Sequence, residues 1–232
     1  MNILNIEENI FLVDTYKDGV FVFSTADNNL NINIKNIHQI ESTLKKIFKL
    51  NSIAYAEQIH SNIVLDIKKH LQQGDALITN ESKTAVGVFT ADCVPILIYD
   101  HHKKVASAVH SGWKGTFNNI LSETINKMIE GYRCSKENMI IYIGPHIRKC
   151  CYEVGDELKE RFLNKGYSED VFTANYLDLN KCIKDEMRKI GIKPSQVLEA
   201  PYCTKCSMEY KFHSYRRDDA ESGRNFSFMF FK

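Results

Sequence analysis

The sequence predicts an α/β (α+β) sandwich in which helices cover mixed β-sheets. Short apolar runs rich in β-branched residues, typical of buried strands, outnumber segments with helical periodicity by roughly two to one. The two kinds of segment also alternate along the chain, as they do when helices pack on sheets. With 232 residues and 44% hydrophobic content, the chain can form one sizeable core, so we expect a single domain over residues 1–232.

The first third of the chain predicts a hairpin, a helix and three short strands. Residues 9–13 and 19–24 are apolar runs around a tight turn, as in a β-hairpin. The Asn- and Asp-rich segment 25–36 predicts a loop, and the apolar spacing of residues 38–50 predicts a helix of about three turns. Further strands are predicted at residues 53–56, 62–67 and 74–79.

The central segment, residues 85–116, has the clearest pattern. Three β-branched-rich runs predict buried strands at residues 85–90, 94–99 and 105–110. Polar residues, including Cys93, separate the first run from the second, and the third run ends in His110. A loop containing glycine then leads into a predicted helix over residues 117–130, which we expect Gly131 to end.

The last third continues the alternation of strands and helices. We expect helices at residues 156–163 and 178–190, and a loop over residues 146–152. A strongly charged loop is predicted at residues 216–224. The remaining strands are predicted at residues 139–143, 197–199, 210–215 and 226–231.

The overall charge argues against binding to nucleic acid. The chain contains 30 Lys and Arg residues and 29 Asp and Glu residues, so it has no basic excess with which to displace counterions from a phosphate backbone. No apolar run approaches the ~18–20 residues of a membrane helix, and the first residues have no basic segment typical of a signal peptide. We therefore expect a soluble, cytoplasmic protein without a membrane partner.

The seven cysteines predict free thiols or metal ligands. Their number is odd and no secretory signal accompanies them, so a disulfide framework is disfavoured. The Cys150-Cys151 pair and the Cys203-x-x-Cys206 turn are a candidate structural zinc site. However, a lone C-x-x-C is a weak signal and the first pair lacks the usual spacer, so free thiols are favoured for these four.

Three residues at the edges of predicted strands suggest a metal site. Two imidazoles and one thiolate, from His60, Cys93 and His110, form a set suited to zinc with an open fourth position. The same residues suit a Cys–His dyad, with Cys93 as the nucleophile and either histidine as its base. A buried cysteine beside two hydrogen-bonded histidines is the purely structural alternative.

Basic residues near these candidates suggest an anion site. Residues 110–116 lead into the predicted helix, where free N–H groups favour an anion and Lys114 adds a positive charge. Arg216 and Arg217 follow a predicted strand and offer a bidentate fork for phosphate or carboxylate. An ordinary capped helix and a salt-bridged hairpin end are the structural alternatives.

Gln58 and Asp75 occupy strand-end positions near the candidate metal ligands. Asp75 is a candidate for a carboxylate that orients a metal-bound histidine, for a proton acceptor or for the cap of a turn.

Several ordered blocks of the sequence match one known family. They are residues 58–62 (QIHSN), 75–79 (DALIT), 90–95 (TADCVP), 110–116 (HSGWKGT), 143–145 (IGP), 151–154 (CYEV), 203–204 (CT), 214–218 (SYRRD) and 223–224 (GR). Together, from about residue 50 to the end, the chain resembles the YfiH-like, laccase-domain family of purine nucleoside phosphorylases.

The resemblance implies a zinc ion held by His60, Cys93 and His110, in a sandwich without a Rossmann nucleotide-binding motif. It also implies phosphorolysis of adenosine, inosine, guanosine and S-methyl-5'-thioadenosine, together with adenosine deamination. Purine nucleosides and phosphate are then the partners of a monomer or homodimer. In this family Ala and Arg usually stand where this chain has Ser111 and Lys114, and a glycine-rich turn stands where it has residues 24–27.

The implied chemistry gives the candidate residues roles. Zinc lowers the pKa of a bound water to about 7 for attack on the purine ring, with Asp75 or Asp92 handling the proton near Cys93. For phosphorolysis, Lys114, Arg216 and Arg217 are the candidates to hold phosphate, with Gln58 beside the substrate.

Three other functions remain open at this stage. Two histidines and a cysteine also form copper centres, and older descriptions call some family members copper-dependent polyphenol oxidases. A multicopper oxidase needs many paired histidine motifs, however, and this chain has no H-x-H. A metal-free Cys–His hydrolase and a purine-binding module without turnover are the remaining alternatives.

Overall fold

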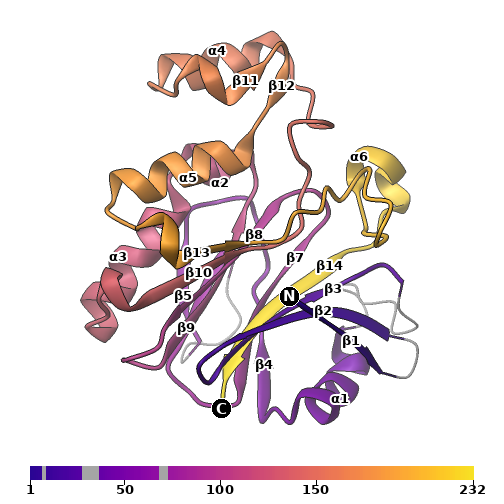
Figure 1. Cartoon of the computed structure of the whole chain (residues 1–232), viewed down its shortest axis with the longest axis vertical. Helices are drawn as coiled ribbons and strands as arrows, with labels where there is room; N and C mark the ends of the chain where they lie inside the picture. Colours follow the sequence, from indigo (N-terminus) through magenta and orange to yellow (C-terminus); the bar gives the residue numbers. More distant parts are fainter. Residues whose placement is uncertain (7–8, 28–36, 68–72) are drawn as a thin grey trace.

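The computed structural model describes residues 1–6, 9–27, 37–67 and 73–232. Two six-stranded sheets pack face to face, and helices cover both outer faces (Figure 1). The predicted sandwich of mixed sheets covered by helices is therefore confirmed. None of the helices in the described ranges is long and apolar enough to span a membrane.

The first sheet contains the predicted hairpin and the C-terminal strand. Neighbouring strands are antiparallel, except that β4 runs parallel to β7. Its edge strand β1 was not predicted, because its residues are mostly exposed and carry no buried apolar pattern. In spatial order the strands are β1 (Asn2–Ile6), β2 (Asn9–Tyr16), β3 (Gly19–Ser24), β14 (Asn225–Phe231), β7 (Thr84–Thr90) and β4 (Ser52–Ala54).

The second sheet contains the other two predicted central strands. Its middle strands are antiparallel, while each edge strand runs parallel to its neighbour. In spatial order the strands are β13 (Val197–Glu199), β10 (Met139–Ile143), β8 (Val94–Asp100), β9 (Val105–Ser111), β6 (Ala76–Thr79) and β5 (Val64–Asp66).

The space between the two sheets is filled by side chains from both. Phe21 and Phe23 of β3 lie beside Tyr142 of β10, with ring centroids 5.6 and 5.2 Å from that of Tyr142. Gly144 follows β10 where the sheets approach closely, and a Cβ there would lie 2.4 Å from a ring carbon of Phe23. This apolar burial on both sheet faces explains why the central strands read as continuous hydrophobic runs.

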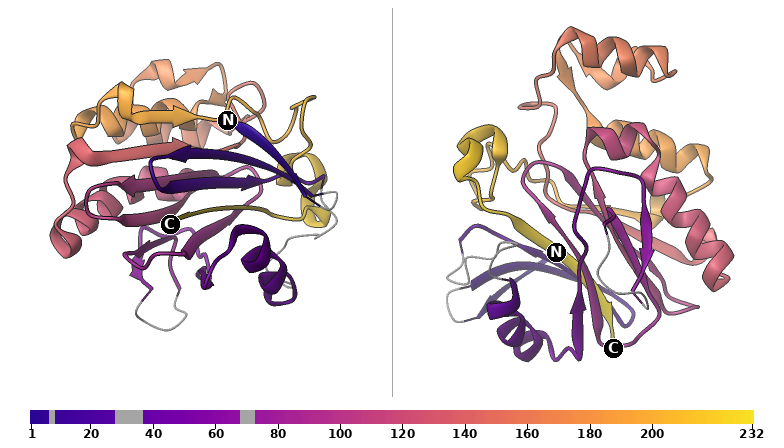
Figure 2. Two further views of the ribbon diagram at one scale, coloured as in Figure 1. Left: turned by 60° about the horizontal axis from the view of Figure 1, so that its bottom comes forward. Right: turned by 180° about the vertical axis from the view of Figure 1, so that it is seen from behind.

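Helices cover the outer faces of the sandwich (Figure 2). Helix α1 lies on the first sheet, where Phe48 packs edge-on against Phe11. Helices α3 and α5 lie on the second sheet, and α4 packs beyond them through Phe162 and Phe117. The bounds are α1 (Ile37–Phe48), α2 (Trp113–Phe117), α3 (Ile120–Tyr132), α4 (Asp156–Asn164), α5 (Leu179–Lys189) and α6 (Tyr215–Asp218), with a small hairpin of β11 (Phe172–Thr173) and β12 (Tyr176–Leu177).

The structure corrects two sequence-based boundaries. The helix predicted at residues 117–130 is α3, which begins at Ile120, and the residues before it form the separate short helix α2. Helix α3 passes through Gly131 and ends at Tyr132, and the next residue, Arg133, forms the C-cap with a left-handed backbone. The strand predicted at residues 210–215 is wrong. That segment is irregular and is held to β14 by the side-chain amide of Asn225, which bonds both backbone groups of His213.

The predicted loop 25–36 is described only through residue 27, and residues 28–36 lie outside the described ranges. The predicted charged loop 216–224 includes most of α6 and a short 3-10 turn, because its polar residues also form local helical hydrogen bonds.

Three crossovers between the sheets meet at one end of the sandwich. The β4–β5 connection carries His60, the β7–β8 connection carries Cys93, and the β13–β14 connection carries Arg216 and Arg224. The strand register brings these ends together, because Val94 pairs with Ser111 and Asn225 pairs with Thr90. Side chains far apart in the sequence thus converge at this end.

Candidate metal centre and substrate pocket

The three candidate metal ligands lie together where the crossovers meet. Ligand atoms of His60, Cys93 and His110 all lie within 4.8 Å of one another. The two imidazole rings are 4.9 Å apart, edge to face, so both can present a nitrogen to one point beside the Cys93 sulfur. The His60 side chain is exposed and that of His110 is buried, so the cluster has a solvent-facing side.

Asp75 organises the loop that carries His60. Its carboxylate, fully buried just before β6, accepts backbone hydrogen bonds from Ile59, His60 and Ser61 at 2.6 to 3.3 Å, and one from the Ser61 hydroxyl at 2.6 Å. His60 has a φ of 59°, a left-handed conformation that is uncommon for a residue other than glycine. The convergent hydrogen bonds hold that conformation.

The same carboxylate orients His110. Its Oδ1 atom lies 2.8 Å from Nδ1 of His110, which leaves Nε2 of that ring on the side of Cys93. Burial raises the pKa of Asp75, but the hydrogen bonds from His110 and Ser61 outweigh burial and bring it to about 2. An ionised carboxylate behind a histidine is the arrangement that fixes the tautomer of metal-binding histidines. The donor set and its orientation therefore fit a zinc ion.

Cys93 and His110 also form a polarised pair. Burial alone would raise the pKa of the Cys93 thiol, but the charges and hydrogen bonds of His110 and His60 lower it. Conversely, burial would lower the pKa of His110, but Cys93 and Asp75 raise it. A thiolate is the form of cysteine that binds metals and acts as a nucleophile, so the pair suits either role.

Gly112 leaves room for the cluster. A Cβ atom at this position would lie 2.8 Å from the Cys93 sulfur and 3.4 Å from Cδ2 of His60. The φ of Gly112 is −73°, which other residues adopt readily, so close approach rather than backbone conformation is what requires glycine here.

The cluster opens into a cavity of about 570 Å³, a size that accommodates a small molecule such as a nucleoside. Its lining includes the aromatic side chains of Phe89, Trp113, Tyr152 and Tyr215. Such rings can contact both faces of a planar heterocycle.

The basic residues that line the cavity are only partly those predicted from the sequence. Arg216 and Arg224 line it, whereas Lys114 and Arg217 are absent from its lining. The guanidinium of Arg216 stacks 5.0 Å from the Tyr152 ring centroid, and its Nη1 donates to the Glu153 carbonyl. Arg224 was not singled out from the sequence as a site residue. Its signal was there, since Gly223-Arg224 is one of the matched blocks.

The other two predicted cations have different surroundings. Arg217 makes a bidentate pair with Asp218, and its Nη atoms also donate to the carbonyls of Thr204 and Phe212. Lys114 is exposed on α2, with its ammonium 5.7 Å from the centre of the Trp113 ring. Their roles in phosphate binding stay predictions.

Asp92 and Gln58 line the cavity but also support the backbone around it. Both carboxylate oxygens of Asp92 accept hydrogen bonds, at 2.6 Å from the Thr204 hydroxyl and at 2.7 Å from the Arg216 backbone N–H. Like His60, Asp92 has a positive φ, of 87°. The Gln58 amide bonds both the N–H and the carbonyl of Phe89, at 2.7 and 2.8 Å, as a neighbouring strand would.

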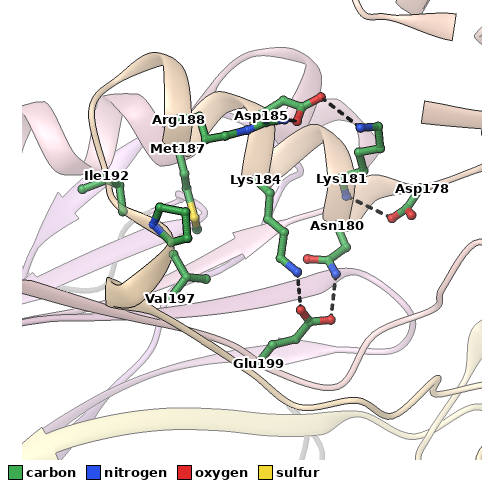
Figure 3. A pocket seen from close by; sticks show the side chains of 11 residues that line it. Asp178, Asn180, Lys181, Lys184, Asp185, Met187, Arg188, Ile192, Val197 and Glu199 are labelled. Atoms are coloured by element: carbon green, nitrogen blue, oxygen red, sulfur yellow. Dashed lines mark hydrogen bonds and ion pairs between the residues drawn. The ribbon is translucent and has the colours of Figure 1, made fainter. Parts of the chain in front are cut away.

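A second cavity, of about 370 Å³, lies between α5 and β13 (Figure 3). Its charged side chains pair with one another. Lys184 and Asn180 donate to Glu199, and Lys181 and Arg188 bind Asp185. Charges paired in this way form a surface network rather than a reactive centre.

Comparison with known proteins agrees with the fold and with the family that the sequence resembles. The family model described as multi-copper polyphenol oxidoreductase laccase matches residues 14–232. A protein of Clostridium acetobutylicum named purine nucleoside phosphorylase is 43% identical, over 99% of each chain. One of Campylobacter jejuni with the same name is 32% identical, over 90% of this chain and 91% of its own.

Solved structures show the same fold at low sequence identity. The crystal structure of the Bacillus licheniformis hypothetical protein YfiH covers 98% of this chain and 97% of its own, with a TM-score of 0.84 and 21% identity. That of YlmD from Geobacillus stearothermophilus covers 94% and 93%, with a TM-score of 0.82 and 21% identity. The chain therefore belongs to the laccase-like family whose model is described as multi-copper polyphenol oxidoreductase laccase.

Proposed function

We propose that this chain is a zinc-dependent purine nucleoside phosphorylase that acts on adenosine, inosine, guanosine and S-methyl-5'-thioadenosine and also deaminates adenosine. The observation that carries the proposal is the convergence of His60, Cys93 and His110 at a cavity that also presents two arginines. The names of relatives that match over nearly the whole chain support the phosphorylase activity.

The cavity can hold the two substrates side by side. The purine lies against aromatic rings such as Phe89 and Tyr152, and phosphate is held by Arg216 and Arg224. In phosphorolysis a phosphate oxygen forms a bond to C1′ of the ribose while the bond from C1′ to the base nitrogen breaks. The electron pair of that bond goes to the base, which takes up a proton. Two guanidinium groups favour this step by holding the phosphate in line and balancing its charge.

His60, Cys93 and His110 would hold zinc, a Lewis acid that would lower the pKa of a water molecule in the cavity. In deamination, water adds to the purine carbon that bears the amino group, and ammonia leaves. Asp75 positions His110 from behind and does not line the cavity. Of the two acids predicted to handle the proton, Asp92 is the one that lines the cavity. Its proton transfer stays a prediction.

The metal-free hydrolase is the second candidate function. The line from Cys93 through His110 to Asp75 is that of a nucleophile, a base and an orienting carboxylate. Such a triad needs one histidine, whereas here both His60 and His110 approach the thiol. The second imidazole favours the metal site.

The test measures products and metal together. Purified protein incubated with adenosine and phosphate is expected to release adenine and ribose 1-phosphate, and without phosphate to release inosine and ammonia. His60→Ala is expected to lose bound zinc at this site and both reactions, while His102→Ala, an exposed histidine in the β8–β9 turn, serves as the matched control. If protein treated with a chelator kept its full activity on adenosine, and alkylation of its thiols abolished that activity, the result would instead support the hydrolase. Copper as the bound metal, with oxidation of a phenol, would support the oxidase.

A further inference from the structure

A second group of potential metal ligands lies on two neighbouring loops outside the candidate active site. Sulfur atoms of Cys150, Cys151, Cys203 and Cys206 all lie within 4.8 Å of one another. The first pair follows β10 and the second follows β13, and more than 50 residues separate the two pairs in the sequence. The fold thus gathers four thiols that the sequence pattern favoured as separate free cysteines.

The two loops are fixed to each other by backbone contacts. His146 and Cys203 form an isolated parallel bridge, and the Thr204 N–H donates to the His146 carbonyl at 3.0 Å. Arg148 extends from the first loop to β13, where its guanidinium binds Glu199 and the carbonyl of Ala200. The four sulfurs are therefore held together by the surrounding chain without a covalent link among them.

Local turns allow each pair to point toward the other. Residues 149–151 form a turn in which the N–H groups of Cys151 and Tyr152 both donate to the Arg148 carbonyl. This turn lets adjacent cysteines reach one centre without the usual spacer. The backbone N–H groups of Arg148, Cys206 and Lys205 are hydrogen-bonded to the Cys203 sulfur. N–H groups directed at a sulfur support thiolate ligands in metal-binding turns.

The sulfur spacing fits a tetrahedral zinc site. The Cys150 and Cys206 sulfurs are 3.7 Å apart, whereas a disulfide holds its sulfurs about 2.05 Å apart. Zinc–sulfur bonds of about 2.3 Å place neighbouring ligands of a tetrahedron about 3.8 Å from one another. The Cys150 and Cys206 sulfurs thus already have the separation that one zinc ion requires, and all four sulfurs lie within 4.8 Å of one another.

We propose that Cys150, Cys151, Cys203 and Cys206 bind a structural zinc ion, at a site that is distinct from that of His60, Cys93 and His110 and takes no chemical part in the proposed reaction. Four thiolates around zinc leave a net negative charge, and Lys149 and Lys205 stand next to ligands in the sequence. All four ligands are thiolates, so the site is closed to substrate, which is typical of structural rather than catalytic zinc.

This site would stabilise one wall of the substrate cavity. Thr204 lies between two of the ligands, and its hydroxyl donates to Asp92 at 2.6 Å. The other oxygen of Asp92 accepts the backbone N–H of Arg216. Tyr152, beside Cys151, stacks on the Arg216 guanidinium. Loss of the zinc ion should therefore weaken phosphate binding through the position of Arg216, as well as lower stability.

The test measures zinc and cobalt bound to the full chain. Wild-type protein is expected to bind two zinc ions per chain, one at each group of ligands. Cys206→Ser and the Cys150→Ser/Cys206→Ser double variant should retain one, and His60→Ala should also retain one. Cys206→His keeps four ligands and should retain two, and Met208→Ala, a change at an exposed residue of the same loop that removes no ligand, is the matched control.

Cobalt distinguishes the two sites by their ligands. In His60→Ala protein loaded with cobalt, a tetrathiolate centre should give intense sulfur-to-cobalt charge-transfer bands that disappear on the additional change Cys206→Ser. One zinc ion per wild-type chain, unaffected by Cys206→Ser but lost in His60→Ala, would overturn the proposal. Disulfides among these four cysteines in protein purified under reducing conditions, or copper bound in place of zinc, would overturn it as well.

Discussion

Replacing Gly112 by alanine tests whether Cys93 acts as a metal ligand. The added Cβ would lie 2.8 Å from the Cys93 sulfur, whereas ordinary contacts between non-bonded atoms are about 3.5–4.0 Å. The sulfur must therefore move by about 1 Å, several times the roughly 0.2 Å over which metal–ligand distances vary. We expect metal affinity at this site to fall about 10- to 100-fold, as when the support of a ligand is removed, which corresponds to about 1.4–2.8 kcal/mol.

The assay for Gly112→Ala is a zinc titration against a competing chelator, with the melting temperature measured in parallel. Gly131→Ala is the matched control, because a Cβ there meets no atom within 4 Å and alanine favours the interior of α3. The fold should persist in both variants, since the backbone of Gly112 suits alanine. Unchanged zinc affinity in Gly112→Ala would refute the assignment of Cys93 as a ligand.

Three further predictions concern Asp75, the two arginines of the substrate cavity, and Glu199. Asp75→Asn removes the charge behind His110 and should lower zinc affinity about 10- to 100-fold in the same titration; wild-type affinity would show that the carboxylate does not support the ligand. Arg216→Gln and Arg224→Gln should each raise the KM for phosphate at least about tenfold, the loss of one charged hydrogen bond, while deamination without phosphate changes little. An equal loss of both reactions would argue against phosphate binding by these arginines. Burial raises the pKa of Glu199, but hydrogen bonds from Lys184 and Arg148 outweigh it and hold the pKa below its ordinary value of 4.5. The stability that Glu199 contributes is therefore present above pH 4.5 and is lost as pH falls through the folded-state pKa. The difference in unfolding free energy between wild type and Glu199→Gln should shrink in acid, and a difference independent of pH would contradict this account.

The central strands could be predicted because they are buried on both faces. The runs that became β7, β8 and β9 are buried at every position and mostly apolar, so no choice of face or register was needed to recognise them. The segment 210–215 was misjudged as a strand from its composition alone. Its aromatic residues resemble a strand, but only Phe212 among its large apolar side chains is buried. Its backbone hydrogen bonds come partly from the Asn225 amide, a tertiary contact that local sequence does not reveal.

The candidate site shows the same division between local and long-range information. His60, Cys93 and His110 were proposed as ligands from their chemistry and the family resemblance, and the crossovers between sheets bring them together. Spacing could not decide between free thiols and a joint zinc site for the four cysteines, because the two pairs meet only through the pairing of the loops after β10 and β13. Nor could spacing indicate which arginine faces the cavity, since Arg216 and Arg217 are adjacent but point to different partners.

The measurement that tests the central claim most directly is ribose 1-phosphate formation from adenosine and phosphate by protein stripped of metal and then resupplied with zinc. Zinc dependence predicts that stripped protein is inactive and that zinc restores activity to wild type but not to His60→Ala, whose ligand set is incomplete. Equal activity before and after stripping, or restoration of His60→Ala by zinc, would contradict it.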